Sequence, residues 1–148
     1  PGFDLGFADA GNKGFEALAW DARSRSLMLG KERSPMGLFS LPFPGDDGAA
    51  GVMQPFGDGN LGMRDISSLS IDARTGHALV LSDESRMLLE IDRAGRPVSF
   101  LSLLGGLNGL DSGIQQAEGV AMDEQGNIYI VAEPNLFYVF SKVQADAG

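Results

Sequence analysis

Short apolar runs alternate with turn residues along this chain. In the middle of the sequence the runs cover 66–71, 77–82, 87–91 and 98–103, and the residues between them are mostly Gly, Asp, Ser, Arg and Pro. Runs of this length with such breaks predict β-strands. Four strands within about 40 residues, joined by short turns, predict an antiparallel meander of the kind that forms one blade of a β-propeller.

The same pattern occurs three times at a fixed period. Asp21, Asp72 and Asp123 mark equivalent points, 51 residues apart. Self-similarity at such a period indicates a repeat architecture. The sequence therefore predicts an all-β fold, a β-propeller of about three antiparallel four-stranded blades, which cover approximately 14–62, 63–113 and 114–142.

Several of the apolar runs show no alternation of apolar and polar residues. The runs at 78–81, 128–131 and 136–140 are continuous, as expected for strands that are covered on both faces. Inner strands of a propeller are covered in this way because each blade stacks on two neighbours.

The first and third copies are less regular than the second. The first has a loose stretch at 42–62, in which we expect one outer strand near 52–56, and the third stops after its third strand. The segment 2–7 is a strand candidate that would supply the missing fourth strand. Propellers have about 4–8 blades, so three blades do not close a ring. Either the natural protein is longer or two chains combine.

Acidic residues recur at matching places in the copies. In an antiparallel hairpin, the start of the first strand and the end of the second lie at the same end. The first strand of a blade lines the central axis, so we expect five carboxylates at one mouth of the channel: Glu16, Glu32, Asp83, Glu118 and Glu133. Clustered carboxylates repel one another, and a hard cation removes that repulsion. Calcium is favoured over magnesium, because calcium takes more oxygen ligands from protein in flexible geometry. The alternative is that these acids cap turns and pair with Lys31, Arg33 and Arg86.

Composition narrows the classes of function. The formal net charge is −9, from 20 acidic and 11 basic residues, which argues against nucleic-acid binding. The chain has no Cys and a single His, which excludes thiolate zinc sites, Cys nucleophiles and a centre with several His ligands. No apolar run approaches the roughly 18 residues of a membrane span.

Other residues that suggest chemistry have simpler interpretations. Asp21, Asp72 and Asp123 each open a turn, where an Asp side chain accepts backbone hydrogen bonds. His77 lies at the opposite end of its strand from Ser82, so a hydrolase triad is rejected and His77 is expected to be a surface turn residue. Trp20 is expected in the core or in packing at the opposite end of the blade.

At these same residues the sequence resembles a known family. The stretches FEALAWD (15–21), LSDES (81–85), AEGVAMD (117–123) and EPNLFY (133–138) are similar to the SdiA-regulated, YjiK-like bacterial propeller proteins, and the likeness runs from about 14 to 142. The resemblance implies a propeller of six blades in the bacterial envelope or periplasm, of which this chain is the carboxyl-terminal half, with any anchoring segment outside the chain. Some members are described as calcium-regulated or phytase-like.

Two functions follow as expectations. The first is a divalent-cation-binding propeller that acts as a ligand-binding or interaction module. The second is a calcium-dependent phosphate-ester hydrolase, for which no catalytic residue is assigned, since no nucleophile or base with a partner is evident. The expected partner is a second copy that closes a six-bladed ring, or the other half of the propeller.

Overall fold

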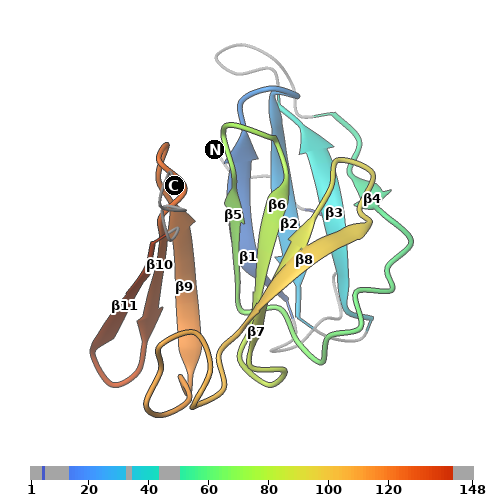
Figure 1. The fold of residues 1–148 in the computed structure, drawn as a ribbon. Helices are drawn as coiled ribbons and strands as arrows, with labels where there is room; N and C mark the ends of the chain where they lie inside the picture. The colour runs from blue at the N-terminus through green and yellow to red at the C-terminus, as the bar shows by residue number, and fades with distance from the viewer. Residues whose placement is uncertain (1–4, 6–13, 33–34, 44–50, 142–148) are drawn as a thin grey trace.

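A computed structural model describes residue 5 and residues 14–32, 35–43 and 51–141. These residues form eleven strands and no helix (Figure 1). The strands are β1 (Phe15–Asp21), β2 (Ser26–Lys31), β3 (Gly37–Pro42), β4 (Gln54–Phe56), β5 (Ser68–Ile71), β6 (Ala78–Ser82), β7 (Met87–Ile91), β8 (Pro97–Ser102), β9 (Ala117–Met122), β10 (Ile128–Ala132) and β11 (Leu136–Phe140).

The strands make three antiparallel sheets in chain order. The first sheet is β1-β2-β3-β4, the second is β5-β6-β7-β8 and the third is β9-β10-β11. We call them blades 1, 2 and 3. The predicted all-β fold with repeated meander sheets is confirmed. The outer strand expected near 52–56 is β4, and in the described residues blade 3 has no fourth strand. The candidate strand 2–7 lies outside the described residues apart from Leu5, which is not in a strand.

The first strands of the blades lie side by side, β1 against β5 and β5 against β9. Two apolar cores result. Ala17, Ile66 and Val80 belong to the core between blades 1 and 2, and Leu81, Ala117 and Ile130 to the core between blades 2 and 3. Residues 78–82 of β6 are buried throughout, because blade 2 is covered on both of its faces.

The burial of blade 3 differs from the prediction made from its sequence. Its runs 128–131 and 136–140 were predicted to be covered on both faces, but only one face is covered. Val131, Phe137 and Val139 are 48%, 63% and 51% exposed. The three lie on the face turned away from blade 2, where the described chain provides no further blade.

The aspartates at the turns have the structural role predicted for them. Asp21 accepts a hydrogen bond from the Arg23 backbone N–H at 2.9 Å, and Asp72 accepts the same bond from Arg74 at 2.9 Å. Asp123 bonds to the backbone and side chain of Asn127. These bonds hold the tight turns that join the first and second strands of each blade.

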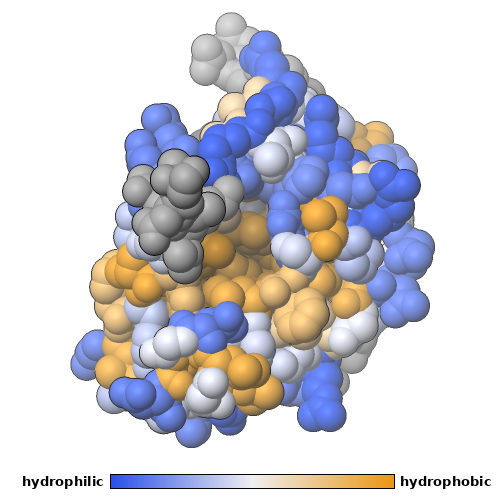
Figure 2. All heavy atoms as spheres, in the orientation of Figure 1, coloured by the Kyte–Doolittle hydropathy of each residue, from blue (hydrophilic) through white to orange (hydrophobic). Residues whose placement is uncertain are grey.

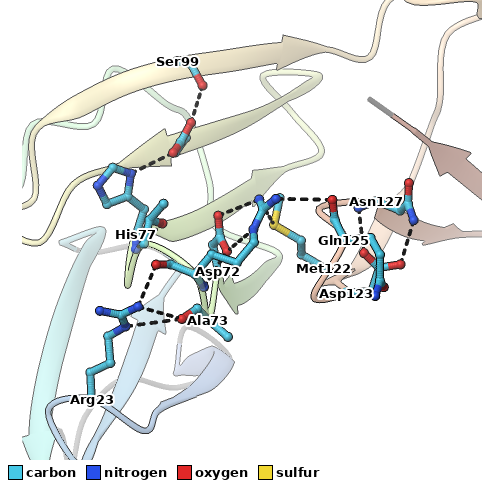
Figure 3. Close-up of polar contacts among 12 residues, drawn as sticks. Arg23, Asp72, Ala73, His77, Ser99, Met122, Asp123, Gln125 and Asn127 are labelled. Carbon is cyan, nitrogen blue, oxygen red and sulfur yellow. Dashed lines mark hydrogen bonds and ion pairs between the residues drawn. The ribbon is translucent and has the colours of Figure 1, made fainter. Parts of the chain in front are cut away.

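Two arginines next to these aspartates tie neighbouring blades together (Figure 3). Arg23 donates from its guanidinium to the carbonyl oxygens of Ala73 and Arg74, at 3.0 and 2.6 Å. One repeat later, Arg74 donates to the Gln125 carbonyl oxygen at 3.3 Å. The same kind of hydrogen bond, from an arginine side chain to a backbone carbonyl oxygen, therefore joins blade 1 to blade 2 and blade 2 to blade 3.

Trp20 differs from expectation. It is 46% exposed on the outer face of β1, so it does not belong to the core. His77 lies beside the turn of blade 2 and is half-buried, and its Nδ1 lies 2.7 Å from a Glu90 carboxylate oxygen. Glu90 also accepts a hydrogen bond from Ser99 at 2.6 Å, which engages the histidine in a structural network at the turn end of blade 2 (Figure 3).

Candidate cation site

Two of the predicted acids sit at β-bulges. In the β1–β2 pair, Phe15 lies opposite Lys31 and Ala17 opposite Gly30, so Glu16 has no partner across the ladder. In the β9–β10 pair, Ala117 lies opposite Ala132 and Gly119 opposite Val131, which leaves Glu118 unpaired in the same way. A bulge inserts one extra residue and redirects its side chain, and bulges are common beside functional sites.

The other predicted acids follow the second strand of each blade. Glu32 comes directly after β2, Asp83 after β6 and Glu133 after β10. Backbone bonds fix this end of two blades: the Glu32 N–H donates to the Gly14 carbonyl oxygen at 3.4 Å, and the Glu133 N–H donates to the Gln116 carbonyl oxygen at 3.0 Å. Because the hairpins are antiparallel, the bulge acids and these acids lie at the same end of the molecule.

One cavity of about 420 Å³ gathers most of these acids. Four of the five predicted acids line it, Glu16, Glu32, Asp83 and Glu118, together with Asp65, Ile66, Ser67 and Glu84. Glu133 is not among the lining residues, and its carboxylate accepts a bond from the Gln116 side chain at 3.3 Å. All three blades contribute to the lining, and among the described residues no Lys or Arg is part of it.

Asp65 is a cavity residue that the sequence pattern did not reveal. It is buried, and its Oδ1 accepts hydrogen bonds from the Ser82 hydroxyl and from the Glu84 backbone N–H at 3.1 Å. The equivalent positions in the other copies are Gly14 and Gln116. A search for acids that repeat therefore passes over Asp65.

Ser67 stands where the other copies have a bulge glutamate. Its hydroxyl donates to the Leu81 carbonyl oxygen at 3.3 Å, so the hydroxyl is used within blade 2. Asp83 links blades at the same level, because its carboxylate accepts the Ala117 N–H of β9 at 3.3 Å. The middle blade thus places Asp65 and Asp83, rather than a bulge glutamate, at the cavity.

The cavity carries a concentrated negative charge. Partial desolvation raises the pKa of Glu118, and the carboxylates of Glu133, Asp83, Asp65 and Glu16 raise that pKa further. Acids from all three blades therefore interact with Glu118, including Glu133, which is outside the cavity lining. In the described residues no three acids converge closely enough to enclose a metal ion. The arrangement is a ring of acids around a space rather than a formed coordination shell.

Comparison with known proteins agrees with this architecture. The family described as SdiA-regulated matches residues 1–141. The chain belongs to the SdiA-regulated family. The resemblance noted in the sequence is thereby confirmed.

Solved propellers share the fold of this SdiA-regulated chain at low sequence identity. A gluconolactonase from Xanthomonas campestris matches with a TM-score of 0.62 and 14% identity, over 84% of this chain and 37% of its own length. A chain in a nidogen–laminin complex matches with a TM-score of 0.62 and 12% identity, over 84% of this chain and 43% of its own. Regucalcin from Agrobacterium tumefaciens strain C58, described as a calcium-binding protein, matches with a TM-score of 0.58 and 12% identity, over 82% of this chain and 39% of its own.

This SdiA-regulated chain thus spans less than half the length of the propellers that it matches. At these identities the likeness shows the β-propeller fold alone. In the described residues there is no helix that is long and apolar enough to cross a membrane.

Proposed function

We propose that the acid cavity binds a divalent cation, calcium in preference to magnesium, and that the protein is a cation-dependent ligand-binding or interaction module of the bacterial envelope. The observation that carries this proposal is the cavity lined by acids of all three blades, where desolvation and the neighbouring carboxylates raise the pKa of Glu118. A cation in the cavity removes the cost of holding these charges together.

Calcium suits this cavity better than magnesium. Calcium takes about 6–8 oxygen ligands in flexible geometry, whereas magnesium requires near-ideal octahedral geometry at short distances. The acids surround a cavity of about 420 Å³ without three of them converging. An ion with flexible coordination geometry, which binds both carboxylates and water, fits this arrangement of acids around the cavity. The likeness to regucalcin is consistent with this choice of metal, although it supports the fold alone.

Calorimetry and thermal unfolding test the proposal. Calcium binding only to the folded state stabilises it by about 1.4 kcal/mol at ten times Kd, which is roughly 3–5 °C in Tm. We expect this rise with calcium, a smaller rise with magnesium, and almost none with sodium chloride of matched ionic strength.

Matched variants locate the effect. Glu118→Gln removes a cavity acid and should reduce the calcium-dependent rise in Tm. Glu124→Gln removes an exposed acid from the β9–β10 turn, at the other end of blade 3, and should leave the rise unchanged. Absence of calcium heat together with an unchanged Tm at millimolar calcium would contradict the proposal.

A calcium-dependent phosphate-ester hydrolase is the second candidate. The raised pKa of Glu118 favours it, because a carboxyl group whose protonated form is stabilised can serve in proton transfer. A bound calcium ion would supply an electrophile for phosphate and water. Against it, no Lys or Arg in the part of the chain that the structure describes lines the cavity. Assay of a panel of phosphate esters with and without calcium separates the two functions, and hydrolysis that is lost in Glu118→Gln would favour the enzyme.

A further inference from the structure

Asp65 is a buried carboxylate that no basic side chain neutralises. Asp65 is only 5% exposed, and in the part of the chain that the structure describes no Lys, Arg or His forms an ion pair with it. Buried charges in proteins are as a rule paired with an opposite charge or bound to a metal ion. Asp65 therefore stands out among the residues of the acid cavity.

Asp72 shows the usual arrangement of a buried aspartate. It is 4% exposed and lines a separate hollow of about 500 Å³ between blades 2 and 3, where apolar side chains gather on the face drawn in Figure 2. The Asp72 carboxylate pairs with the Arg74 guanidinium at 2.8 Å. The buried carboxylate of that hollow is thus already compensated, whereas the buried carboxylate of the acid cavity is not.

The two carboxylate oxygens of Asp65 have different surroundings. Oδ1 accepts hydrogen bonds from the Ser82 hydroxyl and from the Glu84 backbone N–H, the latter at 3.1 Å. Oδ2 has no hydrogen-bond partner among the described residues, although every side-chain oxygen of these residues that is shut off from solvent has one. Solvent therefore reaches Oδ2, and because Asp65 lines the acid cavity, we place Oδ2 at the cavity wall.

A network of hydrogen bonds fixes the orientation of the Asp65 side chain. Ser82, which donates to Oδ1, also accepts the Ser85 backbone N–H at 2.9 Å, and the Ser85 hydroxyl accepts the Arg64 backbone N–H at 2.9 Å. The network joins residues 64–65 to the turn that follows β6. A carboxylate held in this way is preorganised, because little of its side-chain freedom remains to be lost when a ligand binds.

Blades 2 and 3 meet at this side of the cavity. The carboxylates of Asp65 and Asp83 both act on Glu118 of blade 3, and Asp83 also accepts the Ala117 backbone N–H of that blade at 3.3 Å. An ion beside Asp65 is therefore near the carboxylates of both blades. Since no three acids of the described residues enclose an ion, water molecules complete its coordination.

We propose that Asp65 is the anchoring ligand of the cation, that it binds through Oδ2, and that the bound ion stiffens the turn at 82–86. The inference rests on the proposed cation binding and adds the position of the ion and its effect on the protein. Without the ion, repulsion from Glu118 and Asp83 opposes the placement of the Asp65 carboxylate. With the ion, attraction holds the carboxylate in place, so the hydrogen bonds from Ser82 and from the Glu84 N–H open less often.

Calorimetric titration of Asp65→Asn with calcium tests the anchoring role. The asparagine Oδ1 keeps an acceptor for Ser82 and for the Glu84 N–H, while the amide NH₂ replaces the free oxygen by a donor that cannot bind a cation. We expect the Kd for calcium to rise at least about tenfold, and by more than in Glu118→Gln, because Glu118 is exposed.

Asp58→Asn is the matched control for this titration. Asp58 is exposed, precedes β5 as Asp65 does, and accepts the Asn60 backbone N–H at 2.9 Å, but it is not among the residues that line the acid cavity. This variant should bind calcium as tightly as the wild-type protein.

Amide hydrogen exchange of the wild-type protein tests the effect on the turn without any substitution. Calcium should slow exchange of the Glu84 and Ser85 amides severalfold, because these amides exchange by local opening of the network. The Thr75 and Gly76 amides, in the turn at the opposite end of blade 2, should exchange equally fast with and without calcium.

The outcomes separate this inference from the proposed function. A wild-type protein that takes up no calcium overturns both. Calcium binding that Asp65→Asn leaves as tight as in the wild type, or that leaves exchange of the Glu84 and Ser85 amides unchanged, overturns this inference while cation binding by the cavity stands. Should Asp65→Asn lose the circular dichroism spectrum of the wild type in chelator, the exchange experiment alone decides.

Discussion

Glu118 carries its negative charge at a cost. Desolvation and the surrounding acids raise the pKa of Glu118 above the ordinary 4.5. A carboxyl group whose pKa is higher in the folded than in the unfolded protein binds more protons in the folded state, so stability falls as pH rises from about 4.5 through the raised pKa. The penalty is fully present once the pH lies above the raised pKa.

This linkage predicts that Glu118→Gln stabilises the metal-free protein at pH 7. The gain should be small, up to about 0.5 kcal/mol, as is usual for an exposed position. Urea unfolding at pH 7 in chelator measures it, with Glu124→Gln as the control. The sign should reverse with calcium present, because the variant then loses a ligand. A loss of stability in chelator would show that the ring of acids does not oppose ionisation of Glu118.

Asp72 has the opposite linkage. The Arg74 guanidinium beside Asp72 lowers the pKa of its carboxyl group from 3.8 to about 2. The stability that this pair contributes is therefore present above pH 3.8 and is lost as pH falls toward 2. Asp72 is only 4% exposed, whereas Arg74 is exposed, so solvent screens the pair in part.

We expect Asp72→Asn to lower the free energy of unfolding at pH 7 by about 1 kcal/mol, since the exposure of Arg74 weakens the pair. Its stability should also fall less steeply than that of the wild type between pH 4 and 2. Urea unfolding across this range, with Asp58→Asn as an exposed control that keeps the turn geometry, gives both quantities. Parallel acid profiles for wild type and Asp72→Asn would refute the role of the pair.

At the scale of single residues, the sequence predicts the features that recur in each copy of the repeat. The turn aspartates and the acids that follow the second strands could be read from the 51-residue spacing. Asp65 could not be, because Gly14 and Gln116 occupy its equivalent positions. The exposure of Trp20 also escaped prediction, since local pattern shows that a residue is apolar but not whether a neighbouring blade covers it.

At the scale of strands, close approach between blades constrains β2. A methyl group added to Gly30 would lie 2.7 Å from Ile66 Cγ2 and 3.1 Å from Ala17 Cβ, whereas one added to Gly14 meets nothing within 4 Å. Ile66 and Ala17 both belong to the core between blades 1 and 2. Gly30 therefore lets β2 pack tightly where the two blades meet.

Gly30→Ala should destabilise the protein by about 1–3 kcal/mol through overpacking, which is roughly 2–10 °C in Tm. Thermal unfolding checks this value, and Gly14→Ala is the matched control with no expected loss. A stabilised Gly30→Ala would mean that the blades separate at this point without penalty.

Strands were predictable here because apolar runs and turn residues are local features. The bulges at Glu16 and Glu118 were not, since a bulge depends on the register of two strands and leaves little mark on either sequence. The hydrogen bonds from arginine side chains to the next blade were also not predictable from the sequence. Arg23 and Arg74 are visible as a repeat, but their acceptors are backbone carbonyl groups of the next blade, which no side-chain pattern identifies.

At the scale of the whole molecule, the two outer blades differ from the middle blade in the apolar surface that they expose. Strand β6 of blade 2 is buried on both faces, whereas the outer faces of blades 1 and 3 expose Leu18, Trp20, Phe137 and Val139. The repeat indicated three blades, and the described residues form three sheets. Which faces stay open could not be predicted, because the continuous apolar runs of blades 2 and 3 look alike in sequence.

The single Trp of the chain reports on this surface. If blade 1 of one copy packs on blade 3 of another, Trp20 becomes buried on association. Its emission should then shift to shorter wavelength, and iodide should quench it less, as the protein concentration rises from about 1 to 100 µM, around a Kd in the micromolar range.

Phe137→Glu puts a charge into the opposing apolar face and should hold the emission at its dilute value. Val98→Glu, an exposed substitution on the outer strand of blade 2, should not. Trp20 emission that is independent of concentration, while light scattering still reports a dimer, would show that the copies associate through a surface other than the open faces of the terminal blades.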